Sequence, residues 1–316
     1  MKCTVTNAAD PRGLLRGESE WSLNKEKNTR KHLKDIPSVL SRLDEIESAV
    51  RGRNLFAALD FDGTLAPLDN DPGAVEMTAE MKKRLKNLAL RCPVAIVTGR
   101  DLEDIRDRVG LEELFYSGSH GFQIAGPPGS GLSFEAGGEF LPALDKAERL
   151  LPGIIEGVPG AFIQRKRFSI SIHYRMVRRE LVRGLVEKTG RAVKGIGGLV
   201  ARHDKKSVEV LPRMNWNKGS ALLWILDATG MTEANSFAVS VGDDITDEDM
   251  HVAVKGRGAG IIVTGTEPPL STFADYRLGS VAEAGRFIEI LERIAGNVTR
   301  GQESPAGGTQ ASPPIT

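Results

Sequence analysis

Short apolar runs alternate with amphipathic segments along most of this chain. Five runs are apolar almost without interruption, as strands buried on both faces of a parallel sheet are: residues 55–59, 93–97, 114–117, 237–241 and 259–263. Other segments carry apolar residues at steps of three and four, which predicts helices: residues 78–90, 101–109, 218–229, 246–254 and 281–294. This alternation predicts an α/β fold in which helices cover both faces of a parallel sheet.

The alternation changes in the middle of the chain. A Gly-Pro-Pro-Gly-Ser-Gly turn within residues 121–135 predicts a hairpin, and further paired strands with two helices follow it up to residue 212. Paired strands around helices are typical of an α+β unit. We therefore expect such a unit at residues 123–212, inserted into a core domain formed by residues 54–122 and 213–297.

The two ends of the chain differ from this core. Residues 1 to about 30 are polar and aperiodic. Apolar residues at three- and four-residue steps then predict an amphipathic helix over residues 29–51, in which Pro37 marks either the start or a break. We group residues 1–53 as an N-terminal arm and helix. Residues 298–316 are rich in Gly, Ser and Pro, and we expect them to be disordered.

Composition and charge exclude several classes of protein. The chain has 316 residues with 42 basic and 42 acidic side chains (42 − 42 = 0), which argues against coating nucleic acid or an anionic membrane. Cys3 and Cys92 form neither a disulfide framework nor a metal-binding pair, so we expect a cytoplasmic protein. No apolar run approaches the ~18 residues that span a bilayer. We expect no nucleic-acid or membrane partner, and the oligomeric state stays open.

The first candidate site is the string Asp60-Phe-Asp62-Gly63-Thr-Leu at the end of an apolar run. Residues two apart in an extended segment point to the same side, and active sites of open α/β sheets gather at the carboxyl ends of strands. Two adjacent carboxylates repel each other unless a cation lies between them, and hard oxygen ligands suit Mg²⁺. The alternative for a bare Asp-x-Asp pair is a turn that caps the strand. The full string favours the metal site.

Three further segments repeat this pattern. In the first, Thr98 and its neighbouring backbone N–H groups follow a strand and would hold an anionic oxygen, or would only cap the next helix. In the second, Lys218 opens a helix, where a cation opposes the helix dipole unless an anion lies nearby. In the third, Asp243 and Asp244 follow a strand, and the helix cap that explains Asp247 does not explain them. A divalent cation would.

The ordered set DFDGTL, VTGR, the helix-opening Lys218 and GDD resembles the four signatures of the haloacid-dehalogenase-like phosphatases. The resemblance covers about residues 54–295. It implies a Rossmannoid parallel-sheet core with an inserted α+β cap of the type called C2B. The strings GDDITDED, Ser-His-Gly at 119–121, His-Tyr-Arg at 173–175 and VEVLPR at 208–213 are similar to trehalose-6-phosphate phosphatases in particular.

The resemblance implies a role for each motif residue. Asp60 would be the nucleophile that forms an aspartyl-phosphate, and Asp62 the general acid and base. Thr98 and Lys218 would hold the phosphoryl oxygens. Mg²⁺ would be bound by three aspartates and supported by a fourth. These are Asp60, Asp62 through its backbone carbonyl, Asp243, and Asp244 or Asp247.

The cap and the residues beside it would recognise the sugar. Charged and hydroxyl-binding groups suit a disaccharide, which offers many hydroxyls and little apolar surface. The candidates are Arg100, Gly118, His120, Gly121, Lys166, Arg175, Glu209 and Arg213. Each has a structural alternative: the run 165–167 is typical of a solvated face, and His173 lies in an alternating strand where a core histidine is equally expected.

The resemblance thus implies a Mg²⁺-dependent phosphatase that hydrolyses trehalose 6-phosphate, the last step of trehalose biosynthesis. Within the enzyme class, the alternative is a capped phosphatase acting on sucrose phosphate or on a mannosyl or glucosyl phosphate. Outside it, the alternative is a non-catalytic regulatory relative, joined to a trehalose-phosphate synthase partner through the N-terminal helix. The clustered carboxylates argue against a silent module, because they are costly to maintain without a cation.

Overall fold

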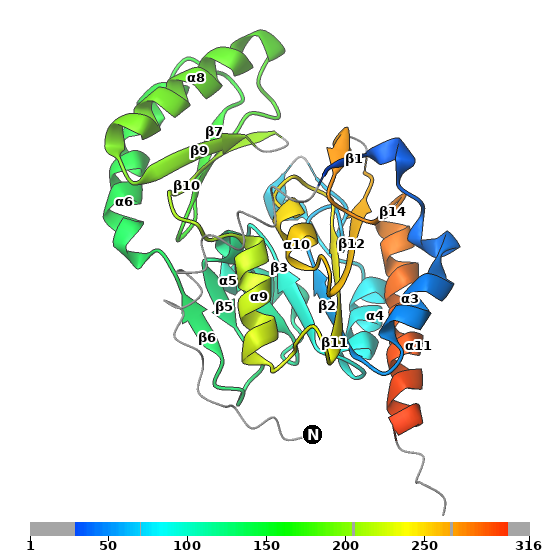
Figure 1. Cartoon of the computed structure of the whole chain (residues 1–316). Helices are drawn as coiled ribbons and strands as arrows, with labels where there is room; N and C mark the ends of the chain where they lie inside the picture. The colour runs from blue at the N-terminus through cyan, green and yellow to red at the C-terminus, as the bar shows by residue number, and fades with distance from the viewer. Residues whose placement is uncertain (1–28, 70, 204–205, 266–267, 303–316) are drawn as a thin grey trace, which may run out of the picture.

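A computed structural model describes residues 29–302 of this chain except residues 70, 204, 205, 266 and 267 (Figure 1). The predicted N-terminal arm and the last part of the predicted disordered tail lie outside the described residues. Helix α11, Val281–Gln302, runs on into the first residues of the segment that we expected to be disordered. Among the described residues, no helix has the length and apolarity needed to cross a membrane.

Eight strands form the main sheet, in the order β14-β12-β11-β2-β3-β4-β5-β6. The first six are mutually parallel, as the apolar runs predict. They are β2 (Asn54–Leu59), β3 (Val94–Val97), β4 (Phe115–Gly118), β11 (Ser236–Gly242), β12 (Gly258–Val263) and β14 (Tyr276–Leu278). The hairpin of β5 (Gln123–Ala125) and β6 (Ser133–Glu135) is antiparallel and extends the edge of this sheet. We had expected this hairpin in the inserted unit. Because its strands belong to the main sheet, the inserted unit begins after β6.

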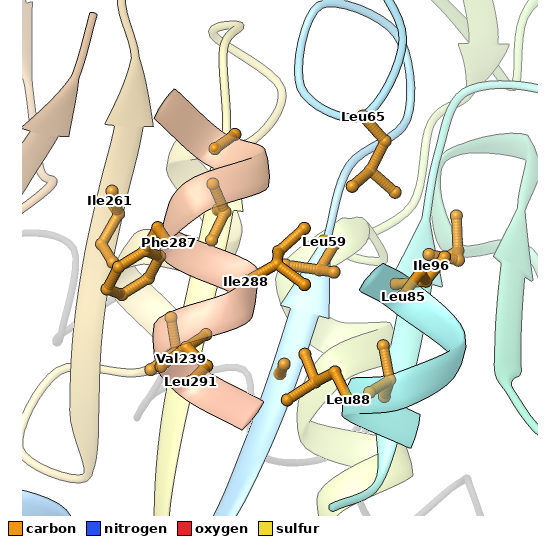
Figure 2. Close-up of a cluster of buried hydrophobic side chains, with 14 of the residues drawn as sticks. Leu59, Leu65, Leu85, Leu88, Ile96, Val239, Ile261, Phe287, Ile288 and Leu291 are labelled. Atoms are coloured by element: carbon orange, nitrogen blue, oxygen red, sulfur yellow. The ribbon is translucent and has the colours of Figure 1, made fainter. Parts of the chain in front are cut away.

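Successive side chains of the central strand β2 point to opposite faces of the sheet. Leu55, Ala57 and Leu59 belong to one buried cluster, and Phe56 and Ala58 to another. The first cluster packs under α3 (Leu43–Val50), α4 (Ala79–Ala89), α5 (Leu102–Val109) and α11, and Figure 2 shows Leu59 between α4 and α11. The second packs under α9 (Lys218–Ala228) and α10 (Glu248–Ala253). Burial on both faces explains why these strands are apolar without interruption.

The N-terminal segment forms only one short helix where we expected a helix over residues 29–51. Strand β1 (Lys31–His32) pairs with β13 (Ser271–Thr272), and two 3₁₀ turns, Leu33–Asp35 and Val39–Ser41, precede α3. The fixed φ and missing N–H of Pro37 explain the break. Val39 and Ile46 nevertheless reach the main core, so the segment packs as part of the domain.

The inserted unit has its own sheet and its own core. The order is β7-β8-β10-β9 with every pair antiparallel, and the strands are β7 (Phe162–Arg165), β8 (Ile170–His173), β9 (Leu199–His203) and β10 (Ser207–Pro212). Helices α6 (Leu141–Leu150), α7 (Pro152–Ile155) and α8 (Arg179–Ile196) cover one face. Figure 1 shows this unit as a separate lobe beside the carboxyl ends of the core strands. Polar residues of its strands, among them Gln164 and Glu209, line a cavity together with residues of the core.

Candidate functional site

Three buried carboxylates meet at the carboxyl ends of β2 and β11. Asp60 follows β2, Asp243 follows β11, and Asp247 lies just before α10. One oxygen of each carboxylate lies within 4.8 Å of the other two, and all three residues are buried. The central parallel strands β2 and β11 are neighbours in register, which is why residues so distant in sequence converge here. We call this set the acidic cluster.

Lys218 lies within hydrogen-bond distance of two members of the acidic cluster. Its Nζ donates to Oδ1 of Asp60 at 2.8 Å and to Oδ1 of Asp247 at 2.7 Å. Burial alone would lower the pKa of this ammonium, but the carboxylates of Asp247 and Asp60 outweigh burial and raise the pKa. Lys218 is therefore a permanent cation, and its place in the first turn of α9 is explained by the anions opposite it.

Burial raises the pKa of Asp60 well above its ordinary value, and the charges of Asp247 and Asp243 add to this rise, while Lys218 opposes it. A single lysine thus leaves a surplus of negative charge on three buried carboxylates. A divalent cation would remove that surplus, and oxygen donors at this spacing suit a hard cation. The residues present therefore fit a divalent metal.

The fourth acidic position was left open in our prediction as Asp244 or Asp247. The acidic cluster contains Asp247, and the Asp244 carboxylate accepts a hydrogen bond from the N–H of Ile245. Oδ2 of Asp247 accepts the backbone N–H groups of Asp243 and Asp244, both at 3.0 Å. These two hydrogen bonds tie Asp247 to the loop and so hold Asp243 in a defined position.

Asp62 is not a member of the acidic cluster, and its carboxylate is bonded to Arg100. The Arg100 guanidinium donates to both oxygens of Asp62, at 2.6 and 2.8 Å, and also to Asp104 at 3.0 Å. We predicted Arg100 as a substrate-binding residue, and in the structure its guanidinium forms an ion pair with Asp62. The Asp62 side chain remains about a third exposed, at 30%, and it faces the cavity described next.

A cavity of about 270 Å³ opens between the acidic cluster and the cap sheet, and we call it the front cavity. Thr98, at the end of β3, lines it and is buried, so it can offer its hydroxyl to an anionic oxygen beside Lys218. Gly99 makes room for the His120 ring, because a β-carbon on Gly99 would lie 2.6 Å from Cε1 of His120. His120 itself has a φ of +59°, a strained conformation of the kind that gathers at functional sites.

Glu209 on β10 projects from the cap sheet toward the core. Its Oε2 lies 3.8 Å from Nζ of Lys166 and 3.8 Å from Nε2 of His120. Burial alone would raise the pKa of Glu209, but the Lys166 ammonium and the His120 ring outweigh it and hold the pKa well below its usual range. The cap and the core thus meet around a buried carboxylate that stays ionised.

Three predicted substrate residues do not line the front cavity. A β-carbon on Gly118 would lie 2.5 Å from the backbone N of Leu102, and one on Gly121 would lie 2.6 Å from the carbonyl oxygen of Asn217. Both glycines therefore permit close packing of backbone behind the cavity wall. Arg213 donates to the Leu199 carbonyl at 3.0 Å and ties the cap sheet to the segment leading into α9. The remaining five candidates do line the cavity: Arg100, His120, Lys166, Arg175 and Glu209.

The alternating strands of the cap bring further side chains that we had not assigned to the site. Phe162, Gln164, His173, Lys206 and Ser207 line the front cavity. His173 is not a core residue: its ring stacks on Phe162 at 4.4 Å, and its Nε2 lies 2.9 Å from Oε1 of Gln164. The alternation of side chains along β7 and β8 could have identified these residues from the sequence. Side chains on the sheet face opposite α6 and α8 must point toward the core.

Comparison with known proteins gives consistent matches. A family model described as trehalose-phosphatase matches residues 58–278. Trehalose-phosphate phosphatase B of Arabidopsis thaliana is 32% identical over 286 residues, covering 88% of this chain and 76% of the relative. Trehalose 6-phosphate phosphatase RA3 of Zea mays is 32% identical over 273 residues, covering 82% and 76%.

Solved structures match as well. The C-terminal domain of a C. albicans trehalose-6-phosphate phosphatase has a TM-score of 0.70 at 22% identity, covering 83% of this chain and 99% of that one. An Aspergillus fumigatus trehalose-6-phosphate phosphatase has a TM-score of 0.55 at 26% identity, covering 82% and 99%. These matches confirm the predicted haloacid-dehalogenase-like fold.

Proposed function

Because the chain belongs to the trehalose-phosphatase family, we propose that it hydrolyses trehalose 6-phosphate to trehalose and inorganic phosphate. The observation that carries the proposal is the acidic cluster with Lys218, which lies inside the matched region and beneath the polar face of the cap sheet. That arrangement provides a nucleophile, a fixed cation for phosphoryl oxygens, and hydrogen-bonding groups for a sugar.

In the first step, a carboxylate oxygen of Asp60 attacks phosphorus, and the bond between phosphorus and the sugar oxygen breaks. Asp62 gives its proton to the departing oxygen, so the sugar leaves as a neutral alcohol and an aspartyl-phosphate remains on Asp60. Lys218 and Thr98 bind the equatorial phosphoryl oxygens, where charge must be positioned and stabilised. In the second step, Asp62 takes a proton from water, and the resulting hydroxide attacks phosphorus to release phosphate and restore Asp60.

The ion pair between Arg100 and Asp62 must open during this catalytic cycle. Asp62 must be free to reach the departing oxygen to act as an acid, whereas here both of its carboxylate oxygens accept hydrogen bonds from Arg100. The pair therefore has to loosen when the phosphate dianion arrives, and Arg100, which lines the same cavity, can then bind that dianion. This agrees with the predicted role of Arg100 as a substrate-binding residue.

We assign Mg²⁺ as the cation that completes the acidic cluster. Asp60, Asp243 and the backbone carbonyl of Asp62 would hold it, and Asp247 would support them by fixing the loop of Asp243. When bound, Mg²⁺ would neutralise the nucleophile and the phosphate and lower the pKa of Asp60. A trehalose-phosphate synthase, which would supply the substrate, stays a predicted partner, and the cytoplasm a predicted location.

The test is phosphate release over a panel containing trehalose 6-phosphate, sucrose 6-phosphate, glucose 6-phosphate and mannosyl phosphates, with and without Mg²⁺. We expect the highest kcat/KM on trehalose 6-phosphate, loss of activity in a chelator, and recovery on adding Mg²⁺. Preference for sucrose phosphate or a monosaccharide phosphate would contradict the substrate. Full activity in the chelator would contradict the metal.

Asp60→Asn tests the nucleophile. The amide cannot form an aspartyl-phosphate, so we expect no detectable turnover on any substrate, with a far-ultraviolet spectrum like that of the parent chain. Asp44→Asn, on the exposed surface of α3, is the matched control and should keep full activity. Turnover by Asp60→Asn at more than a trace would remove this mechanism, whatever the substrate.

A further inference from the structure

The carboxylate of Asp101 lies at the start of α5 but does not cap this helix. Asp101 is the N-cap residue, with φ −64° and ψ 151°, and its side chain accepts no capping hydrogen bond from the helix. An aspartate at this position ordinarily accepts a backbone N–H of the first turn, which stabilises the helix. Because α5 lacks that contact, the carboxylate serves other segments of the fold.

Two segments farther along the chain donate to Asp101, one from the core and one from the cap. Its Oδ1 accepts from Oγ of Ser119 at 2.7 Å and from the backbone N–H of Arg167 at 3.0 Å. Its Oδ2 adds a longer contact to the same N–H, at 3.2 Å. Ser119 follows β4 of the core, and Arg167 lies in the loop between β7 and β8 of the cap. One carboxylate oxygen thus joins the two lobes.

Each of these partners is next in sequence to a side chain that faces Glu209. Ser119 directly precedes His120, whose Nε2 lies 3.8 Å from Oε2 of Glu209. Arg167 directly follows Lys166, whose Nζ lies 3.8 Å from the same oxygen. Glu209 is only 4% exposed, and a buried charge depends on partners that are held in place. The aspartate of α5 therefore holds the backbone beside both groups that face this carboxylate.

The turn that carries His120 is strained, and the loop of Asp101 holds it. Ser119 and His120, with φ of +50° and +59°, are the only residues other than glycine with positive φ in the described part of the chain. Such strain persists only where the surrounding structure fixes it. The N–H of Ser119 donates to the Arg100 carbonyl at 2.6 Å, and the N–H of His120 donates to the Thr98 carbonyl at 2.9 Å. The bond from Oγ of Ser119 to Asp101 adds a side-chain contact to this set.

We propose that Asp101 is a positioning residue that holds both neighbours of Glu209 in place, one from each lobe. These neighbours are His120 in the core and Lys166 in the cap. The inference rests on the proposed function, in which these three side chains are the predicted sugar-binding groups of the front cavity. The contact with the strained turn lies within the core, whereas the contact with the β7–β8 loop forms only when the cap stands against the core. Asp101 therefore couples the assembly of this group to the position of the cap.

Three substitutions of Asp101 separate bridging from helix capping and from charge. Asp101→Ala removes both bonds, and Asp101→Ser offers a good helix cap but has a side chain too short to reach both partners. Asp101→Asn removes the charge but keeps Oδ1, the oxygen that accepts both bonds. KM and kcat are measured with trehalose 6-phosphate and with p-nitrophenyl phosphate, which carries no sugar. Asp107→Ala, which removes an exposed carboxylate of the same helix, is the matched control.

We expect KM for trehalose 6-phosphate to rise about tenfold in Asp101→Ala and Asp101→Ser and to stay within about threefold of the parent value in Asp101→Asn. The kcat with p-nitrophenyl phosphate should change less than about twofold in all three variants. Recovery in Asp101→Ser would show a helix cap, and a loss in Asp101→Asn equal to that in Asp101→Ala would show a role of charge. Either result would overturn the proposal, as would equal losses on both substrates.

Hydrogen exchange tests the bridge without any substrate. The backbone amide of Arg167 should exchange at least about tenfold faster in Asp101→Ala and Asp101→Ser than in the parent chain and Asp101→Asn. If the parent chain hydrolyses p-nitrophenyl phosphate but not trehalose 6-phosphate, the proposed function fails, and the exchange rates still decide whether Asp101 holds the loop. Equal exchange in all four chains would overturn the proposal whatever the substrate.

Discussion

Gly63 shows how one residue can decide the geometry of a site. Its backbone has a φ of +81°, and a β-carbon built there would lie 2.1 Å from Oδ2 of Asp243. The turn that follows Asp60 and Asp62 therefore needs glycine for two reasons, namely the left-handed conformation and the space that Asp243 occupies. Only the first reason can be inferred from the sequence, because the second depends on a strand far along the chain.

Gly63→Ala separates these two reasons. We expect it to lose about 1 kcal/mol of stability through backbone strain and at least roughly a hundredfold in kcat, because Asp243 must move. Gly52→Ala is the matched control, since Gly52 has a φ of +75° but nothing within 4 Å of its β-carbon position. It should show the same loss of stability in urea unfolding with unchanged kcat. Equal kcat in the two variants would contradict the role given to Gly63.

His251 is a buried residue that the catalytic proposal does not use. Its Nδ1 lies 2.9 Å from Oγ of Ser240 on β11, and the ring packs against Gly260 of β12. Burial lowers its pKa to about 4; the charges of Asp247 and Asp275 oppose this shift, and those of Lys255 and Lys218 add to it. The ring is therefore neutral in the folded protein at neutral pH.

This lowered pKa predicts a loss of stability in acid. Between pH 6.5 and 4 the unfolded chain binds a proton at this residue and the folded chain does not, so the free energy of unfolding falls as pH falls. The contribution lost by pH 5 is about 2 kcal/mol, and below pH 4 it changes no further. Urea unfolding of the parent chain and of His251→Gln at pH 7 and pH 5 measures it. The variant should lose about 2 kcal/mol less than the parent; equal losses would contradict the prediction.

At the scale of elements, α9 and α10 approach each other closely enough to need a glycine. A β-carbon on Gly219 would lie 2.3 Å from the carbonyl oxygen of Asp249. Because Gly219 follows Lys218 directly, this contact between the helices also sets the position of the lysine against Asp60 and Asp247. The position of the catalytic cation is thus a property of helix packing.

Gly219→Ala should push the two helices apart. We expect a loss of about 1–3 kcal/mol from overpacking, together with a lower kcat because Lys218 is displaced. Gly190→Ala in α8 has nothing within 4 Å of its β-carbon and should instead raise the free energy of unfolding by about 0.5–1 kcal/mol without changing kcat. Thermal unfolding and steady-state kinetics on both variants check the contrast. Stabilisation by Gly219→Ala would show that the helices do not meet as described.

At the scale of the whole molecule, the loop between β7 and β8 connects the cap to the core across the cleft. The backbone N–H of Arg167 donates to Oδ1 of Asp101 at 3.0 Å, and its guanidinium donates to Glu135 on β6 at 2.9 and 3.0 Å. Arg167 is half exposed, so its ion pair adds little to stability. It does bias how far the cap stands from the acidic cluster, and closure over the substrate excludes water from the reaction.

Arg167→Ala should therefore change the kinetics more than the stability. We expect less than about 1 kcal/mol of change in unfolding and a rise of roughly threefold to tenfold in KM, because the cap spends less time near the core. Arg183→Ala is the control, since its partner Glu187 lies on the same outer helix. Raised salt should increase KM in the parent chain and have less effect in Arg167→Ala. A KM that salt and substitution leave unchanged would contradict a bridging role.

Several predictions from sequence needed tertiary structure to correct them. The hairpin β5–β6 was expected in the cap because paired strands follow one another there, yet its strands extend the main sheet next to β4. The helix expected over residues 29–51 is reduced to α3, because Pro37 breaks it and a 3₁₀ turn, Leu33–Asp35, comes before that proline. Arg213, which we predicted to bind substrate, donates to the Leu199 carbonyl. Local sequence offered Pro37 as a signal for the break, but it contains no signal for the place of the hairpin or for the partner of Arg213.

The sequence by itself determined the α/β class of the core and which strand ends carry the chemistry. Uninterrupted apolar runs, helical periodicity, and carboxylates just after strands are local patterns, and the carboxyl ends of parallel strands must meet. The tertiary structure alone decided that Asp247 joins the acidic cluster and that Arg100 holds Asp62. These depend on distances between segments far apart in the chain, which no local pattern of residues contains.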